Sequence, residues 1–407
     1  MDINSPLSGN PSASSPPDST ADSSSTRATP GYSIEEISTE EGLSYLKDDW
    51  NRLSESVEHP NVFMTFDWFR AWNQFFTHKD RSDRRPHVLV LKKDGGIAGL
   101  SPLINRTASR FGMAVRKLEF VGREGDYNDL VLGNDPAGQI NALVDYLAQT
   151  RRQWDLLELS DLRDTGNTLA IIGGALSRAG LIYRLLPEKE KCPYVPIDAP
   201  TSIIVRRLSQ SKGRRTDGLH TLRKKQHRLE RLSAEGLRVR IIEDPSGESG
   251  LLQKLIALEA QKRVRGELSP PFIANYPEVF QSLFDTLGPR GWFCIGLMEL
   301  GERPIGSRLV FRCGKKLWDF LTAYDHTFSR LSPGTMLVSA LIDYGFSHGF
   351  DEFDFMRGEE SYKMQWTTQM HQSHRLLIWS PGWVSRARAF IYLDLKPAVY
   401  SLMGKGE

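Results

Sequence analysis

A strand-like segment near the C-terminus ends in a dense group of charged and aromatic side chains. Apolar and acidic residues alternate up to Asp354, and Arg357, Tyr362, Lys363 and Trp366 follow within a few positions. Catalysis by proton transfer needs a group that takes up or releases a proton and donors that stabilise developing negative charge. Carboxylate, guanidinium, phenol and ammonium groups gathered at one strand end can supply both.

Each of these side chains has a candidate role in such chemistry. Asp354 would act as a base or orient a substrate group, and Arg357 would hold that carboxylate or a phosphate. Lys363 would stabilise negative charge on a carbonyl or a phosphate. We therefore predict a catalytic group of Asp354, Arg357, Tyr362 and Lys363. The alternative is a solvated turn in which the same charges form a structural ion pair.

A second candidate site precedes a predicted helix. Ser332 stands at the position of an N-cap, and Pro333 fits the first helical position, where its missing N–H costs little. The small residues Gly334 and Thr335 leave backbone amides accessible, and a helix N-terminus binds anions. With Arg330 beside it, this segment predicts a site for a pyrophosphate-bearing cofactor. The alternative is a capped helix without a ligand.

Composition limits the remaining possibilities. The chain of 407 residues has 52 Lys and Arg against 50 Asp and Glu, so nothing global favours nucleic acid, and anion binding must come from local patches. Cys192, Cys294 and Cys313 have no metal-ligand spacing and are too few for a disulfide framework, which indicates a reducing compartment. His371 and His374 have no further ligand at metal spacing, so we predict no metal. No run approaches the roughly 20 apolar residues of a membrane helix.

Two regions of the chain repeat one order of elements. Residues 87–105 and 292–312 each predict a β-hairpin, because apolar runs flank a polar turn. Each hairpin is followed by another strand, a helical pattern and a closing strand, and Glu158 takes the place of Asp354 in the first copy. This order favours a duplicated α/β unit. The alternative is that meander and helix elements are simply common.

The boundary between the copies is predicted near residues 188–200, which are charged and rich in proline. This gives an N-terminal domain of residues 31–190 and a C-terminal domain of residues 191–407. Residues 1–30 are rich in Ser, Pro and Thr, and we predict that they are disordered because they have little apolar surface to bury.

Two further segments could bind partners. Residues 206–233 form a predicted basic helical arm, which is either a solvated helix packed through its leucines or a contact for phosphate. Residues 383–402 predict a C-terminal helix that docks on its own domain or lies at a membrane surface. The expected location is the cytoplasm, with the face of the inner membrane as the alternative.

The strand order and the loop at residues 330–335 resemble those of the Gcn5-related N-acetyltransferase (GNAT) fold. That family's loop is usually Gln/Arg-x-x-Gly-x-Gly/Ala, and Pro333 and Thr335 depart from it. The resemblance implies acetyl-CoA or another acyl-CoA as donor, and carbonyl polarisation by amides of a splayed strand near residues 321–324. It assigns the donor to Arg330, Ser332, Gly334 and Thr335.

The C-terminal motif is similar to one branch, the CelD-like acyltransferases of bacterial exopolysaccharide gene clusters, which are related to the FemAB peptidoglycan aminoacyl transferases. The branch pattern Asp-Phe-x-Arg-Gly-x-Glu-x-Tyr-Lys-x-x-Trp is matched by Asp354, Arg357, Gly358, Glu360, Tyr362, Lys363 and Trp366. An Asp-Tyr-x-Asp segment of the first copy matches as well. The resemblance implies substrate contacts at Asp126, Tyr127, Asp129, Glu360 and Trp366.

Together these features predict an α/β protein of two tandem GNAT-like domains, each a mixed, mostly antiparallel sheet flanked by helices. The expected reaction moves an acyl group, with acetyl as the simplest case, from acyl-CoA to an amine or hydroxyl. The expected acceptor is a sugar, cell-envelope or exopolysaccharide precursor bound between the domains. Two alternatives remain: a FemAB-like enzyme that uses aminoacyl-tRNA, and an inactive scaffold of a polysaccharide-synthesis complex. Only the former alternative involves nucleic acid.

Overall fold

The structure of the protein is a computed structural model. It describes residues 31–78, 83–110, 113–121, 125–211, 222–224, 227, 230–264 and 272–382. The predicted tail of residues 1–30, the predicted C-terminal helix and much of the basic arm lie outside these described residues. In the described part of the chain, no helix is both long and apolar enough to cross a membrane.

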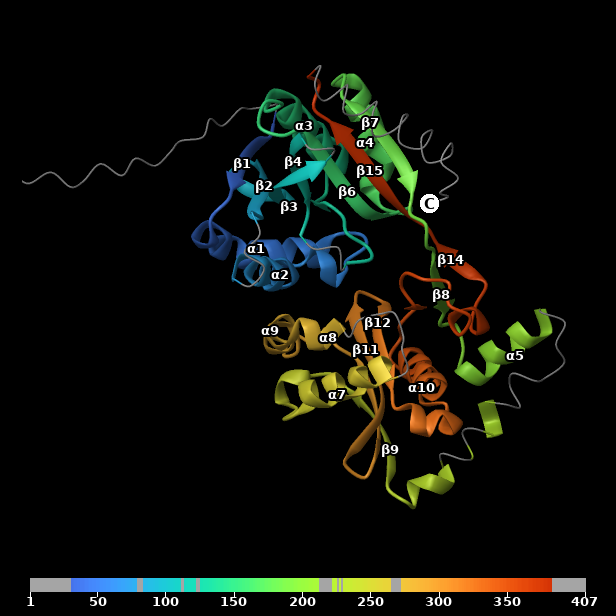
Figure 1. Ribbon diagram of the computed structural model, residues 1–407. Coiled ribbons are helices and arrows are strands. Elements are labelled where there is room, and N and C mark those ends of the chain that lie inside the picture. Colours follow the sequence, from blue (N-terminus) through green and yellow to red (C-terminus); the bar gives the residue numbers. More distant parts are fainter. Residues whose placement is uncertain are drawn as a thin grey trace, which may run out of the picture.

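Residues from the N-terminal half form a mixed sheet together with one strand from the C-terminal end (Figure 1). The strands lie in the order β1-β2-β3-β4-β6-β15-β7, and β5 pairs with β3. Their bounds are β1 (Ser33–Ile37), β2 (Arg85–Lys93), β3 (Gly96–Arg110), β4 (Met113–Phe120), β5 (Val131–Leu132), β6 (Leu156–Arg163), β7 (Ile182–Pro187) and β15 (Ser373–Trp379). One face is covered by α3 (Pro136–Gln149) and α4 (Asn167–Arg178), and the other by α1 (Glu40–Ser56), η1 (Val62–Met64) and α2 (Phe66–His78).

The second sheet has the order β14-β8-β13-β12-β11-β10-β9. Its strands are β8 (Cys192–Pro196), β9 (Leu237–Ile242), β10 (Ile295–Leu300), β11 (Arg303–Cys313), β12 (Lys316–Tyr324), β13 (Glu352–Asp354) and β14 (Gln369–His371). Helices α5 (Thr201–Ser211) and α10 (Pro333–Ser347) lie on one side, and α7 (Leu251–Val264), α8 (Phe272–Asn275) and α9 (Pro277–Leu287) on the other. Short helical turns are η2 (Pro245–Gly247), η3 (His326–Leu331) and η4 (Lys363–Gln365).

The predicted repeat of elements is confirmed. The first hairpin turns at Asp94 and Gly95, whose φ angles of 51° and 80° are both positive, as a two-residue hairpin turn with matching twist requires. The parallel pairing of β4 with β6 ends with Glu119 opposite Glu158, and that of β12 with β13 ends with Trp318 opposite Asp354. Glu158 therefore occupies the place of Asp354, as the sequence predicted. In both copies the parallel strands pair over three residues and then diverge.

The chain crosses between the two sheets twice. It passes from β7 to β8, and it returns from β14 to β15, which lies between β6 and β7 in the first sheet. Leu376 and Ile378 of β15 are buried in the core beneath α3 and α4. Residues 373–379 therefore depart from a linear division of the chain at residue 190. Without β15, β7 would have no partner among the described strands.

The sheet of β1 to β7 with β15 and its helices form the first unit, and the sheet of β8 to β14 with its helices forms the second. A continuous aromatic core joins the two units. The ring of Trp68 on α2 lies 6.0 Å from that of Phe311 on β11 and 5.8 Å from that of Phe320 on β12. At the edge of this core, Arg290 pairs with Asp67 at 2.7 Å. Apolar residues of both units belong to one buried cluster, whose packing fixes the position of one unit relative to the other. The loops that follow β4 and β13 are therefore fixed relative to each other.

Candidate functional site

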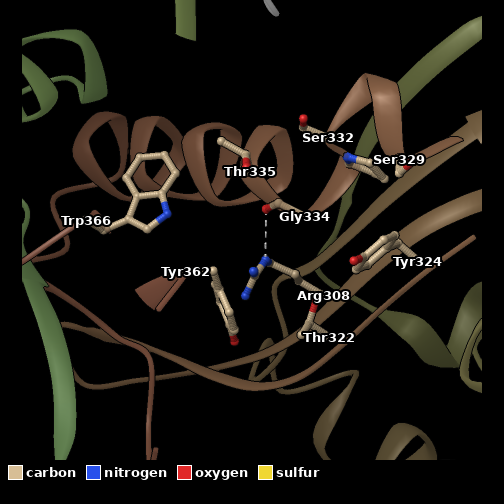
Figure 2. Close-up of a pocket in the computed structure, with 10 residues that line it drawn as sticks. Arg308, Thr322, Tyr324, Ser329, Ser332, Gly334, Thr335, Tyr362 and Trp366 are labelled. Carbon is tan, nitrogen blue, oxygen red and sulfur yellow. Dashed lines mark hydrogen bonds between the residues drawn. The ribbon is translucent and has the colours of Figure 1, made fainter. Parts of the chain in front are cut away.

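A pocket of about 240 Å³ lies in the second unit between β11, β12 and the start of α10 (Figure 2). It exists because β12 pairs with β13 only as far as Trp318, although it continues to pair with β11 as far as Tyr324. Among the described strands, none pairs with this edge of β12 beyond Trp318. The divergence predicted near residues 321–324 is thus present, and Thr322 and Tyr324 line the pocket.

The start of α10 forms the opposite wall. Ser332 is at the N-cap position and Pro333 is in the first turn, as predicted, but the Ser332 side chain does not cap the helix. Side chains that cap a helix come from residues with an extended backbone, whereas Ser332 is left-handed, with φ 52° and ψ 55°. The first amides of a helix have no intrahelical partner, so those of Gly334 and Thr335 are available to an anion. Ser332, Gly334 and Thr335 line the pocket, whereas Arg330 is exposed and does not.

The corresponding helix of the first unit, α3, is capped by a side chain. Asp135 caps α3 by accepting a hydrogen bond of 3.0 Å from the Gly138 N–H, and its other oxygen accepts one of 2.9 Å from the Tyr32 hydroxyl. These hydrogen bonds lower the pKa of Asp135, which keeps the cap anionic. A carboxylate at a helix N-terminus occupies the place where a phosphate would bind. The two copies therefore differ, because a side chain caps α3 and none caps α10.

Arg308 on β11 lines the pocket and was not predicted from the sequence. Its guanidinium is almost fully buried and pairs with Asp319, and its Nε donates a hydrogen bond of 3.2 Å to the Gly334 carbonyl. It also lies 5.5 Å from the ring centroid of Tyr362. Arg308 and Asp319 carry opposite charges and interrupt apolar runs on two strands predicted to be neighbours. This charge complementarity was the sequence feature from which the pair could have been predicted.

Tyr362 and Trp366 close the remaining side of the pocket, as Figure 2 shows. Both were predicted as site residues. Burial raises the pKa of Tyr362, although the charge of Arg308 opposes the shift. The phenol therefore stays protonated at neutral pH and can donate a hydrogen bond.

The side chain of Lys363 is hydrogen-bonded to the backbone of the turn that precedes it. Its Nζ donates hydrogen bonds to the carbonyls of Arg357 at 2.6 Å and Met356 at 3.5 Å, and it pairs with Glu360 at 2.9 Å. The turn needs this support because Met356 has φ 59°, a left-handed conformation that is unfavourable for a non-glycine residue. Lys363 and Glu360 do not line the pocket. Their contacts resemble the structural ion pair that the sequence left open.

The motif loops are residues 126–129 in the first unit and the turn that follows Asp354 in the second, and they meet at the boundary between the units. Tyr127 donates a hydrogen bond of 2.8 Å to Asp354, whose other oxygen accepts one of 2.7 Å from the Met356 N–H. Arg357 pairs with Asp126 at 2.8 Å and with Asp161 at 3.2 Å. Asp354 is fully buried, and this burial raises its pKa to about 6.

This meeting of the loops brings Asp126 and Tyr127 together with Asp354 and Arg357, but it does so through contacts between the units and not around the pocket. Asp129 accepts a hydrogen bond of 2.7 Å from the N–H of Leu130 and is half-buried. None of these five residues lines the pocket.

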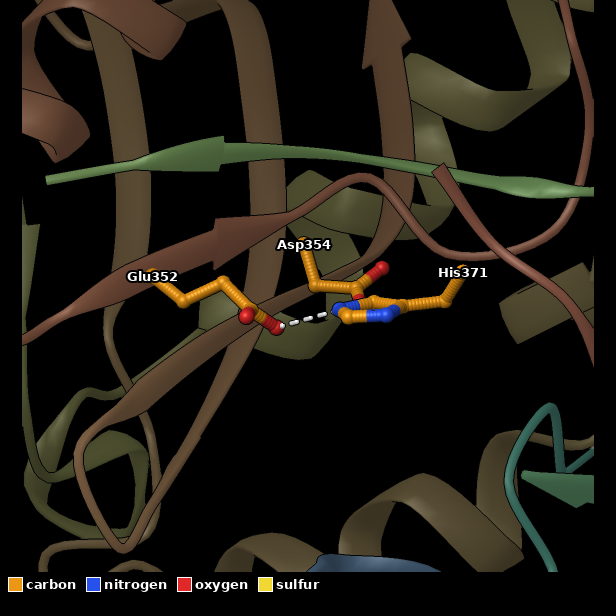
Figure 3. A group of neighbouring side chains, drawn as sticks. All are labelled: Glu352, Asp354 and His371. Atoms are coloured by element: carbon orange, nitrogen blue, oxygen red, sulfur yellow. Dashed lines mark hydrogen bonds and ion pairs between the residues drawn. The ribbon is translucent and has the colours of Figure 1, made fainter. Parts of the chain in front are cut away.

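Glu352, Asp354 and His371 form a compact group that could resemble a metal site (Figure 3). Two cationic side chains already engage it. A terminal guanidinium nitrogen of Arg163 lies 2.6 Å from Nε2 of His371, and Nζ of Lys316 lies 2.9 Å from Oε1 of Glu352. Burial opposes ionisation of Glu352, but His371 and Lys316 outweigh it and lower the pKa of Glu352 to about 2. The group thus fits a buried ion-pair cluster, because a metal would be repelled by both cations.

The fold and the pocket define an α/β protein of two tandem GNAT-like domains. Residues 214–364, which include the pocket, match the family model described as the acetyltransferase (GNAT) domain. The second unit thus contains a GNAT-type acetyltransferase domain, and the predicted fold class is confirmed. No curated protein matches the chain significantly.

Two solved structures share the fold over most of the chain. One is FemX, with a TM-score of 0.59 and 11% identity, covering 88% of this chain and 99% of its own. The other is a conserved protein of unknown function from Bacteroides thetaiotaomicron VPI-5482, with a TM-score of 0.54 and 9% identity, covering 85% of this chain and 99% of its own. At these identities the likeness concerns the fold alone.

Proposed function

We propose that the protein transfers an acyl group, with acetyl as the simplest case, from acyl-CoA to an amine or hydroxyl, and that the pocket of the second unit is the donor site. One observation carries the proposal. The uncapped N-terminus of α10 opens into the same pocket as the unpaired edge of β12. The helix amides and dipole suit a pyrophosphate. The open strand edge suits the amide groups of a pantetheine arm, which can hydrogen-bond as an added strand does.

The size of the pocket fits the reactive arm of CoA. Its volume of about 240 Å³ is below the roughly 300–1,000 Å³ of pockets that enclose a drug-sized ligand. The pocket would therefore enclose the acyl-pantetheine end, while the nucleotide end remains outside it.

The chemistry then uses groups that face the pocket. The acceptor nitrogen or oxygen forms a bond to the thioester carbon, and backbone N–H groups on the open edge of β12 stabilise the oxyanion. The carbon–sulfur bond breaks next, and the Tyr362 hydroxyl donates a hydrogen bond to the departing sulfur. The proton released by the acceptor passes through water to that sulfur, which leaves as the thiol, so the enzyme ends in its starting state.

This proposal gives a structural role, without contact to the reacting atoms, to Asp354, Arg357 and Lys363. Their hydrogen bonds hold the turn that carries Tyr362 and Trp366. The acceptor would be a sugar, cell-envelope or exopolysaccharide precursor, which rests on the resemblance of the C-terminal motif to the CelD-like branch.

The fold likeness to FemX over 88% of this chain favours a second candidate. In it the donor is an aminoacyl-tRNA, as in the FemAB enzymes, to which the branch that the C-terminal motif resembles is related. The two candidates differ in salt dependence, because binding that neutralises several RNA phosphates weakens steeply as salt rises.

Isothermal titration separates the candidates. Acetyl-CoA, longer acyl-CoAs, free CoA and an aminoacyl-tRNA would each be titrated into the protein at low and high salt. We expect saturable binding of CoA and acyl-CoA that changes modestly with salt. Binding of aminoacyl-tRNA alone would support the second candidate, and binding of no donor would support an inactive scaffold.

A further inference from the structure

The side chain of Arg308 joins three walls of the pocket. Its Nε donates to the Gly334 carbonyl in the first turn of α10, its terminal nitrogen pairs with Asp319 on β12, and its Cζ lies 5.5 Å from the ring centroid of Tyr362. Helix, sheet and motif turn come from separate parts of the chain. A single buried guanidinium therefore sets their separation.

The ion pair of Arg308 and Asp319 is not needed for the stability of the fold. Both side chains are 2% exposed, and removing two charges from water costs about as much as their attraction returns. Within the described residues, Oδ1 of Asp319 has no hydrogen-bond partner, so the pair is incompletely satisfied. An apolar pair of similar volume would serve the core at least as well. The position beside the pocket gives the pair another use.

The planar fork of arginine suits that use. Its donors lie in fixed directions, so contact with Gly334 and Asp319 fixes the orientation of the guanidinium beside the Tyr362 ring. A lysine could reach one of these partners but could not hold all three elements at once. Displacing a reacting group by about 1 Å can cost roughly 100-fold in rate.

We infer that Arg308, held by Asp319, is a positioning residue of the donor site, which fixes the phosphate-binding turn of α10 and the hydroxyl of Tyr362 for one bound acyl-CoA. The inference rests on the proposed function. It assigns a task to two residues that lie outside the motifs of the sequence.

The test compares a single variant with a double variant. Arg308→Met leaves Asp319 buried without its partner, so its melting temperature should fall, and loss of activity alone would say little. Arg308→Met combined with Asp319→Asn removes both charges, and its melting temperature should recover toward that of the wild type. We expect the double variant to bind CoA more weakly in isothermal titration and to turn over acetyl-CoA about 100-fold more slowly.

A matched control exists on the same strand. Arg312 pairs with Glu243 at 2.8 Å, and neither residue lines the pocket. Arg312→Met combined with Glu243→Gln should leave CoA affinity and turnover unchanged. Arg308→Lys should fold with a melting temperature near that of the wild type and still turn over slowly, because it keeps the charge without the fork.

The outcomes separate the inference from the proposed function. A stable double variant with wild-type CoA affinity and turnover would overturn the positioning role, as would full activity of Arg308→Lys. If the wild type itself binds no CoA, the proposed function fails first.

Discussion

The hydroxyl of Tyr127 donates a hydrogen bond of 2.8 Å to a carboxylate oxygen of Asp354, 227 positions later in the chain. Tyr127 belongs to the loop after the third strand of the first copy, and Asp354 ends the closing strand of the second. Both residues are buried. The hydrogen bond therefore links the two motif loops, and it couples the geometry of one unit to that of the other.

Removing this hydroxyl should destabilise the protein. Among the described residues Asp354 accepts hydrogen bonds from Tyr127 and from the Met356 N–H, and Tyr127→Phe leaves the second of them. A buried acceptor left without a partner costs about 1–3 kcal/mol, so we expect the free energy of unfolding to fall by about that amount. Urea denaturation at pH 8, where Asp354 is ionised, measures it. Tyr45→Phe, at a side chain that is 79% exposed, is the control, and equal stability of the two variants would contradict the prediction.

Asp161 should make stability depend on pH. Burial raises its pKa to about 7 despite Arg357 and Arg375, and Asp126 and Glu188 add to the shift. The folded protein therefore binds this proton more tightly than the unfolded chain, whose value is near 3.8. The free energy of unfolding should fall as pH rises from about 4 to 7, by up to about 1.4 kcal/mol per pH unit.

Asp161→Asn should remove that contribution. Asparagine tolerates the left-handed backbone of Asp161, whose φ is 59°. We expect the difference in unfolding free energy between variant and wild type to grow in favour of the variant from pH 4 to 7, measured by chemical denaturation at each pH. A difference that stays constant across this range would show that Asp161 does not titrate there.

A negative charge at the start of α10 should block the donor. A Cβ added at Gly334 meets Arg308 at 3.8 Å, which is ordinary contact, so Gly334→Ala should fold and bind CoA. Gly334→Asp adds a carboxylate where a phosphate would bind, beside the helix N-terminus. We expect CoA binding to be lost in the titration of this variant at unchanged melting temperature. Equal affinities of the two variants would place the phosphate elsewhere.

Lys363→Met should lower stability and turnover together. The side chain of Lys363 is 5% exposed, and its Nζ donates to the carbonyls of Arg357 and Met356. A buried acceptor left without its donor costs about 1–3 kcal/mol, and the loosened turn lies close in the chain to Tyr362. Glu360→Gln is the control, because Glu360 is 55% exposed and its loss leaves the carbonyl contacts intact. A loss of turnover at wild-type melting temperature would instead indicate a direct role of Lys363 in the reaction.

The sequence by itself determined the repeated units and part of the pocket. The hairpins, the helix start at Pro333 and the closing strands depend on residues a few positions apart, so periodicity and turn residues predict them. The same local spacing identified Ser332, Gly334 and Thr335, and motif spacing identified Tyr362 and Trp366, all of which line the pocket.

Only the tertiary structure decided which sheet receives β15, that Lys363 serves a backbone turn, and that Tyr127 bonds Asp354. The same holds for Arg308, whose charge interrupts an apolar strand and has meaning only once Asp319 and Gly334 lie beside it. The physical reason is burial. A charged side chain in sequence shows its chemistry, but the partners that bind it inside a protein come from distant positions, and they decide whether it faces a substrate or supports the fold.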